Sequence, residues 1–347
     1  MAKFHKILTD WYQENKRDLP WRENKDAYFV WVSEIILQQT RVDQGIGYFL
    51  RFTKQFPTIK SLALAQENDV LKIWQGLGYY SRARNMHFAA QQIILEHNGK
   101  FPNTYDKIEK LKGVGNYTAS AIASIAFGLP CAAIDGNVYR VLSRIFGIKT
   151  PIDSTTGKKE FRELADQLID THNPGNYNEA IMEFGALQCT PKNPGCNSCP
   201  FKNQCIALSN NEINELPVKS NKIKIRHRYF NYLYIKHKED IFLEKREGKD
   251  IWQNLFQLPL IESEKSVSIE ELLQQNQFRS TFDPNQIVIH SISNEIIHLL
   301  SHQKLHVRFI EIVLLKPIKN QKWIMTHENA LAEYPLPKLI TNYLMDK

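Results

Sequence analysis

The sequence predicts a multidomain protein with a mainly helical N-terminal domain and an α+β C-terminal domain. The chain has 347 residues, which corresponds to about two ordinary domains. Up to residue 215, helical patterns follow one another with Gly and Pro between them, without βαβ alternation. From residue 229, β-branched and aromatic residues dominate the apolar segments. A polar, basic connector at 216–228 separates the two regions.

The individual elements follow from these patterns. Apolar residues at helical spacing predict helices at 26–40, 61–74, 81–98, 117–127, 138–146, 157–171 and 176–188. Strands are predicted at 229–235, 240–245 and 305–315, with a helix at 268–275. A run of helices followed by strands indicates two separately folded domains.

Composition and charge narrow the function classes. Hydrophobic residues make up 43% of the chain and charged residues 23%, as in soluble globular proteins. No apolar stretch approaches the roughly 18 residues of a membrane span, and no apolar segment precedes Trp11, so a cytoplasmic protein is expected. The net charge is +7, and the connector is basic throughout. This suits a polyanion such as nucleic acid, with an ordinary solvated surface as the alternative.

Four of the five cysteines lie close together in a loop rich in Pro, Gly and Asn. Cys189, Cys196, Cys199 and Cys205 have the spacing C-x6-C-x2-C-x5-C, which indicates a metal site rather than a secreted disulfide framework. Four-cysteine zinc sites usually combine two short C-x2–4-C pairs, and only one short pair is present here. The spacing therefore favours a [4Fe–4S] cluster, with zinc and free thiols as alternatives.

Glu34 lies in the middle of a predicted helix, on a face that is mostly apolar. Its neighbours three and four residues away are Val30, Trp31, Leu37 and Gln38. A carboxyl group on such a face is partly desolvated, so its pKa should rise. The alternative is a glutamate turned to solvent at the edge of the apolar stripe.

Two further motifs stand at predicted helix starts. Gly113 and Gly115 form a Gly-x-Gly hairpin before a helix whose first N–H groups suit a phosphate, although many such hairpins are only turns. Asp135 precedes the next helix, where N–H groups and the helix dipole should lower its pKa, a role compatible with a plain N-cap. One raised and one lowered carboxyl would supply the acid and the anionic stabiliser that glycoside hydrolysis requires.

Together these motifs resemble the helix-hairpin-helix DNA glycosylases with a [4Fe–4S] cluster, and among them the MutY-type adenine DNA glycosylases. Other matching segments are Leu19-Pro-Trp-Arg22, Trp31-Val-Ser-Glu34, Gln38-Gln-Thr-Arg-Val42, Gly76-Leu-Gly-Tyr-Tyr80 and Ile134-Asp-Gly-Asn-Val138. The resemblance covers essentially the whole chain. It implies a glycosylase domain at 1–215 with its cluster loop at 189–205, a linker at 216–228, and a Nudix-like (MutT-like) domain at 229–347 that recognises 8-oxoguanine.

The resemblance implies a monomer that removes adenine mispaired with 8-oxoguanine or guanine in double-stranded DNA. Glu34 would be the general acid and Asp135 the stabiliser of the sugar cation, with Tyr117 and Asn137 ordering the site. The residues implied to contact DNA or adenine are Trp21, Arg22, Gln39, Thr40, Val42, Leu77, Tyr79, Gly113, Val114, Gly115, Glu179, Ser301 and His302. The four clustered cysteines would hold one [4Fe–4S] cluster.

Several positions depart from the family's patterns. Tyr117 stands where endonuclease III-type relatives carry a strand-cutting lysine, which favours a monofunctional enzyme. A bifunctional pyrimidine glycosylase and AP lyase is the alternative, and a non-catalytic DNA-binding or nucleotide-sensing module is a third interpretation. Lys112 replaces the usual hairpin proline, and Leu300 replaces the aromatic of a Phe-Ser-His element. No Nudix-box glutamate array follows residues 252–259, so nucleotide hydrolysis is not expected.

Overall fold

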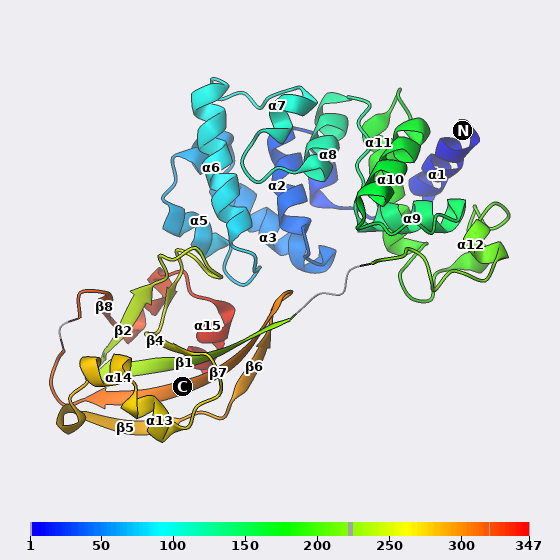
Figure 1. Ribbon diagram of the computed structural model, residues 1–347. Coiled ribbons are helices and arrows are strands. Elements are labelled where there is room, and N and C mark those ends of the chain that lie inside the picture. Colours follow the sequence, from blue (N-terminus) through cyan, green and yellow to red (C-terminus); the bar gives the residue numbers. More distant parts are fainter. Residues whose placement is uncertain (1, 221–224, 319, 347) are drawn as a thin grey trace. The chain divides into compact units, whose positions relative to one another are not determined.

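The computed structural model describes residues 2–220, 225–318 and 320–346 (Figure 1). By its internal contacts the chain divides into two compact units, Met1–Ala65 with Asn85–Asn221, and Gln66–Arg84 with Lys222–Lys347. The sequence places the segment Gln66–Arg84 in the helical domain. Its contacts in the structure instead group it with the C-terminal residues. Lys222 and Lys224 of the predicted linker lie outside the described residues.

The first unit consists of helices joined by short loops. They are α1 Ala2–Asn15, η1 Pro20–Arg22, α2 Ala27–Leu37, α3 Val42–Gln55, α4 Ile59–Ala63, most of α6 Ser81–Glu96, α7 Tyr105–Glu109, α8 Asn116–Phe127, α9 Gly136–Phe146, α10 Thr155–Leu168, α11 Pro174–Leu187, η2 Cys196–Ser198 and α12 Ile206–Ser209. No helix in the described part of the chain has the length and apolar character needed to cross a membrane.

Packing among these helices gathers the elements that build the site. Apolar residues of α1, α9, α10 and α11 form one core, with Leu8, Leu142, Phe161 and Phe184 fully buried. Helix α8 contacts both α2 and α11, and α11 also contacts α1 and α9. The facing surfaces of α2, α8, α9 and α11 therefore meet around one region of the unit.

The predicted single helix at 61–74 is wrong, because the chain forms two helices there. Helix α4 begins at a capping box between Thr58 and Ser61 and ends at Ala63. Helix α5 then spans Glu67–Ile73, and its first turn holds Glu67 and Asp69. Acidic side chains stabilise the positive end of a helix dipole, so they favour a new helix start at this point.

The second unit is built around a mixed sheet of eight strands. They are β1 Arg226–His237, β2 Asp240–Lys245, β3 Phe256–Gln257, β4 Leu260–Ser263, β5 Ile287–Ile292, β6 Ile296–Leu299, β7 Gln303–Leu314 and β8 Trp323–His327. The main order is β3-β2-β1-β7-β5, with β4 beside β1, β6 beside β7 and β8 beside β2. Strands β1 and β7 are parallel, and the other pairs are antiparallel.

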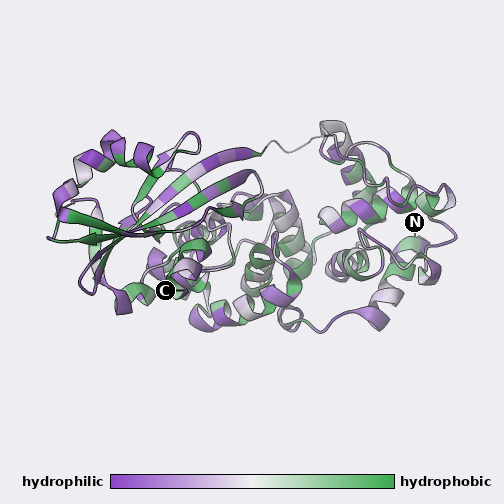
Figure 2. Cartoon of the chain, turned by 90° about the horizontal axis from the view of Figure 1, so that it is seen from below, coloured by the Kyte–Doolittle hydropathy of each residue, from purple (hydrophilic) through white to green (hydrophobic). Residues whose placement is uncertain are grey.

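Alternating side chains bury both faces of this sheet. Along β1, Phe230, Tyr232 and Tyr234 join one core, which α15 (Lys338–Met345) covers. Leu233 and Ile235 join the other core, which α13 (Ile269–Gln274) and α14 (Asn276–Thr281) cover. This period of two follows from the pleat of a strand. Hydrophobic colouring is accordingly concentrated where the strands lie together (Figure 2).

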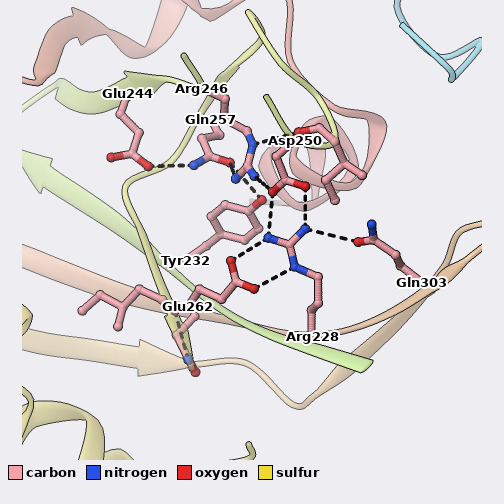
Figure 3. Close-up of polar contacts among 11 residues, drawn as sticks. Arg228, Tyr232, Glu244, Arg246, Asp250, Gln257, Glu262 and Gln303 are labelled. Carbon is pink, nitrogen blue, oxygen red and sulfur yellow. Dashed lines mark hydrogen bonds and ion pairs between the residues drawn. The ribbon is translucent and has the colours of Figure 1, made fainter. Parts of the chain in front are cut away.

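A buried arginine links four segments of the second unit (Figure 3). Arg228 of β1 donates two hydrogen bonds to Glu262, at 2.7 and 2.6 Å, and two to Asp250, at 2.8 and 2.7 Å. It also donates to Gln303 at the start of β7, at 3.2 Å. Arg246 donates to the same Asp250 carboxylate at 2.7 Å. Bidentate pairing of this kind fixes both distance and orientation.

Candidate active site

Glu34 is a buried carboxyl group on α2, with 8% of its surface exposed. The hydroxyl of Tyr117, on α8, donates to Glu34 Oε2 at 2.6 Å and also contacts Met182 Sδ at 3.2 Å. Burial raises the pKa of Glu34 to about 7, although the Tyr117 hydrogen bond acts against the rise. The sequence-based expectation of a raised pKa is therefore confirmed. A group with this pKa can both donate and accept a proton near neutral pH.

Asp135 caps the N-terminus of α9, as its position in the sequence predicts. Its Oδ1 accepts from the Val138 backbone N–H at 2.8 Å, and its Oδ2 accepts from the Asn137 side-chain amide at 2.7 Å. The expected lowering of its pKa is wrong, because burial outweighs these hydrogen bonds and the net direction is upward. Desolvation penalises the charged form, whereas the N–H groups favour it.

Two side chains that the sequence did not single out fix the surroundings of Asp135. Arg140 donates to Asn137 Oδ1 at 2.8 Å and to the Cys189 carbonyl at 2.7 Å, which leaves the Asn137 amide nitrogen aimed at Asp135. Asn178 accepts from the Ala133 N–H at 3.1 Å and donates to the Cys131 carbonyl at 2.8 Å, so it holds the segment leading to Asp135. No sequence pattern marks either role, because each depends on contacts between distant segments.

A cluster of charged side chains lies between η1 and α11. Arg22 Nε is 3.8 Å from Glu179 Oε1, so the structure brings together two of the residues predicted to surround adenine. Burial raises the pKa of Glu179, and Arg22 opposes this rise. Trp21, which the resemblance also implies to contact DNA or adenine, makes an edge contact with Phe49 at 5.6 Å between ring centroids. The charges of Glu179 and Arg22 both affect the pKa of Glu34, so both side chains lie close enough to interact with it electrostatically.

The predicted hairpin lies between α7 and α8. Gly113 has a φ of +78°, and an added Cβ there would come within 2.6 Å of the Asn85 side chain. The Val114 N–H donates to the Leu111 carbonyl at 3.0 Å, which closes the turn. Gly115 is the N-cap residue of α8. The first N–H groups of that helix have no intrahelical partners and point away from its end.

The four clustered cysteines line one small pocket beside Phe184 and Ile145. Their sulfurs lie close enough that Cys189, Cys196 and Cys205 each affect the pKa of Cys199, which burial raises to about 11. Arg144 Nη1 lies 3.5 Å from Cys189 Sγ and donates to the Thr190 carbonyl at 2.7 Å. Among the described residues, no three His, Cys, Asp or Glu side chains are arranged to hold a single metal ion.

Two family descriptions match the chain. Residues 32–168 match the HhH-GPD superfamily of base excision DNA repair proteins, and residues 231–346 match the NUDIX domain. The described fold agrees with both, since the first region is helical with a hairpin and the second is a mixed sheet with helices on both faces.

Individual relatives identify the family. Adenine DNA glycosylases of two Buchnera aphidicola strains are 36% and 35% identical, covering 90% and 97% of this chain and 87% and 97% of their own lengths. The Homo sapiens adenine DNA glycosylase is 43% identical over 62% of this chain and 41% of its own length. The chain belongs to the adenine DNA glycosylases. The predicted family, fold class and enzyme class are thereby confirmed.

Solved structures agree with this membership. The structure of a thermostable thymine-DNA glycosylase has a TM-score of 0.56 and 26% identity, and it aligns with 60% of this chain and 96% of its own. An endonuclease III–DNA complex, with a TM-score of 0.53 and 21% identity, shares the fold. The helical unit of this adenine DNA glycosylase therefore has an endonuclease III-like architecture.

The second unit of this adenine DNA glycosylase contains a pocket of about 430 Å³. It is lined by both chain segments of the unit, including Leu77 and Tyr79 from one and Trp252, Ser301 and His302 from the other. The hydroxyl of Tyr79 is hydrogen-bonded to Ser301 Oγ. Two pairs of predicted contact residues, more than 200 residues apart in the sequence, thus lie around one pocket.

The remaining predicted contact residues lie at the end of α2 and the start of α3. Gln39 has a φ of +57° and its side chain is exposed. Thr40 donates its backbone N–H to the Leu37 carbonyl at 3.2 Å, and Val42 begins α3. A left-handed conformation at Gln39 turns the chain sharply after the helix that holds Glu34. These residues belong to the first unit, whereas Leu77 and Tyr79 belong to the second.

Proposed function

We propose that this adenine DNA glycosylase hydrolyses the N-glycosidic bond of adenine mispaired with 8-oxoguanine or guanine in double-stranded DNA, without cutting the strand. The observation that supports this proposal most strongly is the buried Glu34 carboxyl, with a pKa of about 7 and a 2.6 Å hydrogen bond from Tyr117. Asp135, held by two N–H donors, supplies the second carboxyl that the reaction needs.

Each carboxyl has a separate role in this mechanism. The deoxyadenosine nucleotide is first extruded from the duplex, which costs a few kcal/mol. Protonated Glu34 gives its proton to adenine N7 and makes the base a better leaving group. The Asp135 carboxylate stabilises the positive charge that develops on the sugar, and Glu34, now ionised, activates the attacking water. Tyr117 and the Asn137 amide hold the two carboxyls in place.

Two surfaces would bind the DNA around this site. The start of α8, with Gly113 and Gly115 before it, suits a phosphate, because its N–H groups and dipole favour an anion. The pocket of the second unit would contact the base opposite adenine, with Tyr79 and Ser301 as polar groups and Leu77 as an apolar one. In this role the Nudix-like domain binds without hydrolysing nucleotides. Two of the glutamates that follow Pro259 are already engaged within the domain. Glu262 pairs with Arg228, and Glu271 completes the capping box of α13.

The cysteine pocket would hold one [4Fe–4S] cluster. Four thiol groups that line one pocket fit a cluster in which each iron takes one thiolate. When bound, the cluster would order the loop from Cys189 to Cys205, and it takes no part in the glycosidic step. Iron analysis and a broad absorbance near about 400 nm would identify it, whereas stoichiometric zinc would contradict it.

The absence of strand cutting depends on Tyr117. An AP lyase needs an amine that forms a Schiff base with the sugar, and a phenol cannot form one. Borohydride should therefore trap no covalent complex with DNA that contains either adenine mispairs or damaged pyrimidines. A trapped complex with damaged-pyrimidine DNA would favour the bifunctional alternative.

Single-turnover excision on three duplexes tests the proposal as a whole. Adenine is placed opposite 8-oxoguanine, guanine or thymine at a fixed salt concentration, because binding to DNA depends strongly on salt. Release of adenine from the first two, without release from the third, is the expected result. Mispair binding without any release by the unmodified protein would favour a non-catalytic DNA-binding module.

A further inference from the structure

Glu183 is a buried carboxylate that no motif marked and that receives two arginines. It lies on α11 one helical turn after Glu179, and only 2% of its side chain is exposed. Its Oε1 accepts from the Arg17 backbone N–H and Nε, both at 2.9 Å, and from Arg22 Nη1 at 3.1 Å. Its Oε2 accepts from Arg17 Nη2 at 2.6 Å and from Arg22 Nη2 at 3.0 Å.

These bonds use the whole accepting capacity of the carboxylate. An ionised carboxylate offers about four lone-pair sites, and five N–H groups of two residues converge on this one. Although burial raises its pKa, the hydrogen bonds from Arg17 and Arg22 lower it to about 2, so Glu183 is an anion at neutral pH. Glu183 therefore has no capacity left for a substrate and acts through its neighbours.

The neighbour that matters for chemistry is Arg22. Glu183 holds both of its terminal nitrogens, and Arg22 Nη1 also donates to the Arg17 carbonyl at 2.9 Å. The guanidinium carbon lies 5.4 Å from the centre of the Tyr12 ring. These contacts leave Arg22 Nε facing Glu179, 3.8 Å from its Oε1. The position of the positive charge beside Glu179 is thus set by Glu183.

We propose that Glu183 is a positioning residue for adenine excision, which fixes the Arg22 guanidinium next to Glu179 so that its charge acts on Glu34. This inference rests on the proposed role of Glu34 as the general acid. Arg17 completes the arrangement, because it shares the Glu183 carboxylate and neutralises it. Because Arg17 neutralises the Glu183 carboxylate, Glu183 orients the Arg22 guanidinium without adding a net negative charge.

The electrostatic surroundings of Glu34 link this arrangement to a measurable quantity. The groups that act on its pKa besides burial are Tyr117 from α8, Asp135 at the start of α9, Glu179 from α11 and Arg22 from η1. Arg22 lowers this pKa. Glu183 holds both terminal nitrogens of Arg22, so the structure links Glu183 to Glu34 through the position of Arg22. If Arg22 moves away, the pKa of Glu34 rises.

The test is the pH dependence of single-turnover adenine excision by the full-length enzyme on A:8-oxoguanine DNA. In Glu183→Gln we expect the rate to fall by up to about 100-fold, as for a misplaced group near the reaction. We also expect the alkaline limb of the pH–rate profile, where the rate falls as Glu34 loses its proton, to move to higher pH. Arg22→Gln, which removes the charge itself, should move the limb in the same direction. Glu212→Gln replaces a carboxylate of the same unit that pairs with Lys149, and it should leave the limb in place.

The outcomes separate a positioning role from a structural tether. A tether alone would lower the rate of Glu183→Gln equally at every pH, and a limb that stays in place or moves to lower pH overturns the inference. Glu183→Asp keeps the charge on a shorter side chain, so it should fold and show a smaller upward movement even where Glu183→Gln does not fold. A wild-type enzyme that excises no adenine overturns the proposed function and this inference together, whereas an active enzyme with an unmoved limb in both variants overturns only the inference.

Discussion

The Glu34 site in the first unit and the Arg228 cluster in the second show two opposite arrangements of a carboxyl group: Glu34 is buried without a paired cation among the described residues, whereas the partly exposed Asp250 and Glu262 share a buried arginine. Glu34 accepts one hydrogen bond, from a tyrosine hydroxyl, and in the described part of the chain it forms no ion pair. Asp250 and Glu262 each receive two hydrogen bonds from Arg228 (Figure 3). Burial raises the pKa of Glu34 to about 7, whereas burial is outweighed at Asp250, whose pKa the Arg228 hydrogen bonds lower.

The contrast shows how a paired arginine changes the protonation of a carboxyl group. Without a directly paired cation, the carboxyl exchanges its proton near neutral pH and can serve as an acid. With a bidentate arginine, it stays ionised and ties chain segments together. Arg228 joins β1, the Asp250 loop, β4 and the first residue of β7, close to the segment that holds Ser301 and His302. The first arrangement suits chemistry, and the second suits a rigid binding surface.

The largest effect is expected from Glu34→Gln. This change keeps the shape of the side chain and removes its proton, so adenine excision should fall by about 100- to 10,000-fold, the usual contribution of a general acid. Binding of the A:8-oxoguanine duplex should stay within a few-fold of wild type. The two measurements are single-turnover excision and a gel-shift titration. Excision at the wild-type rate would remove Glu34 from the mechanism.

The next largest effect is on the stability of the protein, and it concerns the Arg228 cluster. Arg228→Met leaves the carboxylates of Asp250 and Glu262 without their cation and should destabilise the protein by about 2–4 kcal/mol. The lower end is favoured, because these two side chains are 33% and 35% exposed and can regain water. Denaturant unfolding measures the change. Lys149→Met, which breaks an exposed pair with Glu212, is the control and should unfold as wild type does.

The two sites also differ in how far the sequence predicted them. Glu34 and the hairpin were predicted because their signals are local, an apolar helical face and two glycines before a helix. Glu183 was not predicted, because its partners Arg17 and Arg22 lie 166 and 161 residues away. The pKa of Asp135 was misjudged for a related reason. Its N–H donors follow within three residues, whereas its burial depends on the whole unit.

Some elements were missed because their sequence suggests loops. Helix α3 (Val42–Gln55) contains Gly45 and Gly47, and glycine usually breaks a helical pattern. In the structure, Gly45 packs against α2, and an added Cβ would lie 2.9 Å from the Leu37 side chain. The glycine is thus needed for close helix packing, which no local pattern reveals. Strands β5 and β6 also carry apolar residues on their exposed faces, such as Val288 and Leu299, so their sequences do not alternate cleanly between apolar and polar residues.

A smaller effect is expected from pH alone, and it tests the raised pKa directly. The folded pKa of Glu34, about 7, lies above its ordinary value of 4.5. The carboxyl is therefore protonated and active below pH 7, and it loses its proton as the pH rises. Excision by the wild-type enzyme should fall by about tenfold for each pH unit above this value. A rate that is constant between pH 6 and 9 would contradict Glu34 as the proton donor.

The smallest effect is expected from Tyr117→Phe. This change removes the hydrogen bond that Glu34 accepts, so the Glu34 site differs still more from the hydrogen-bonded carboxylates of the Arg228 cluster. The phenol donates to Glu34 and stabilises the charged carboxylate, so it lowers the pKa of Glu34. Its loss should raise that pKa further and move the alkaline limb upward, while the rate below pH 7 changes only a few-fold. The hydrogen bond joins α2 to α8, and the same hydroxyl contacts Met182 Sδ at 3.2 Å. A downward movement of the limb would mean that the hydroxyl stabilises the protonated carboxyl instead.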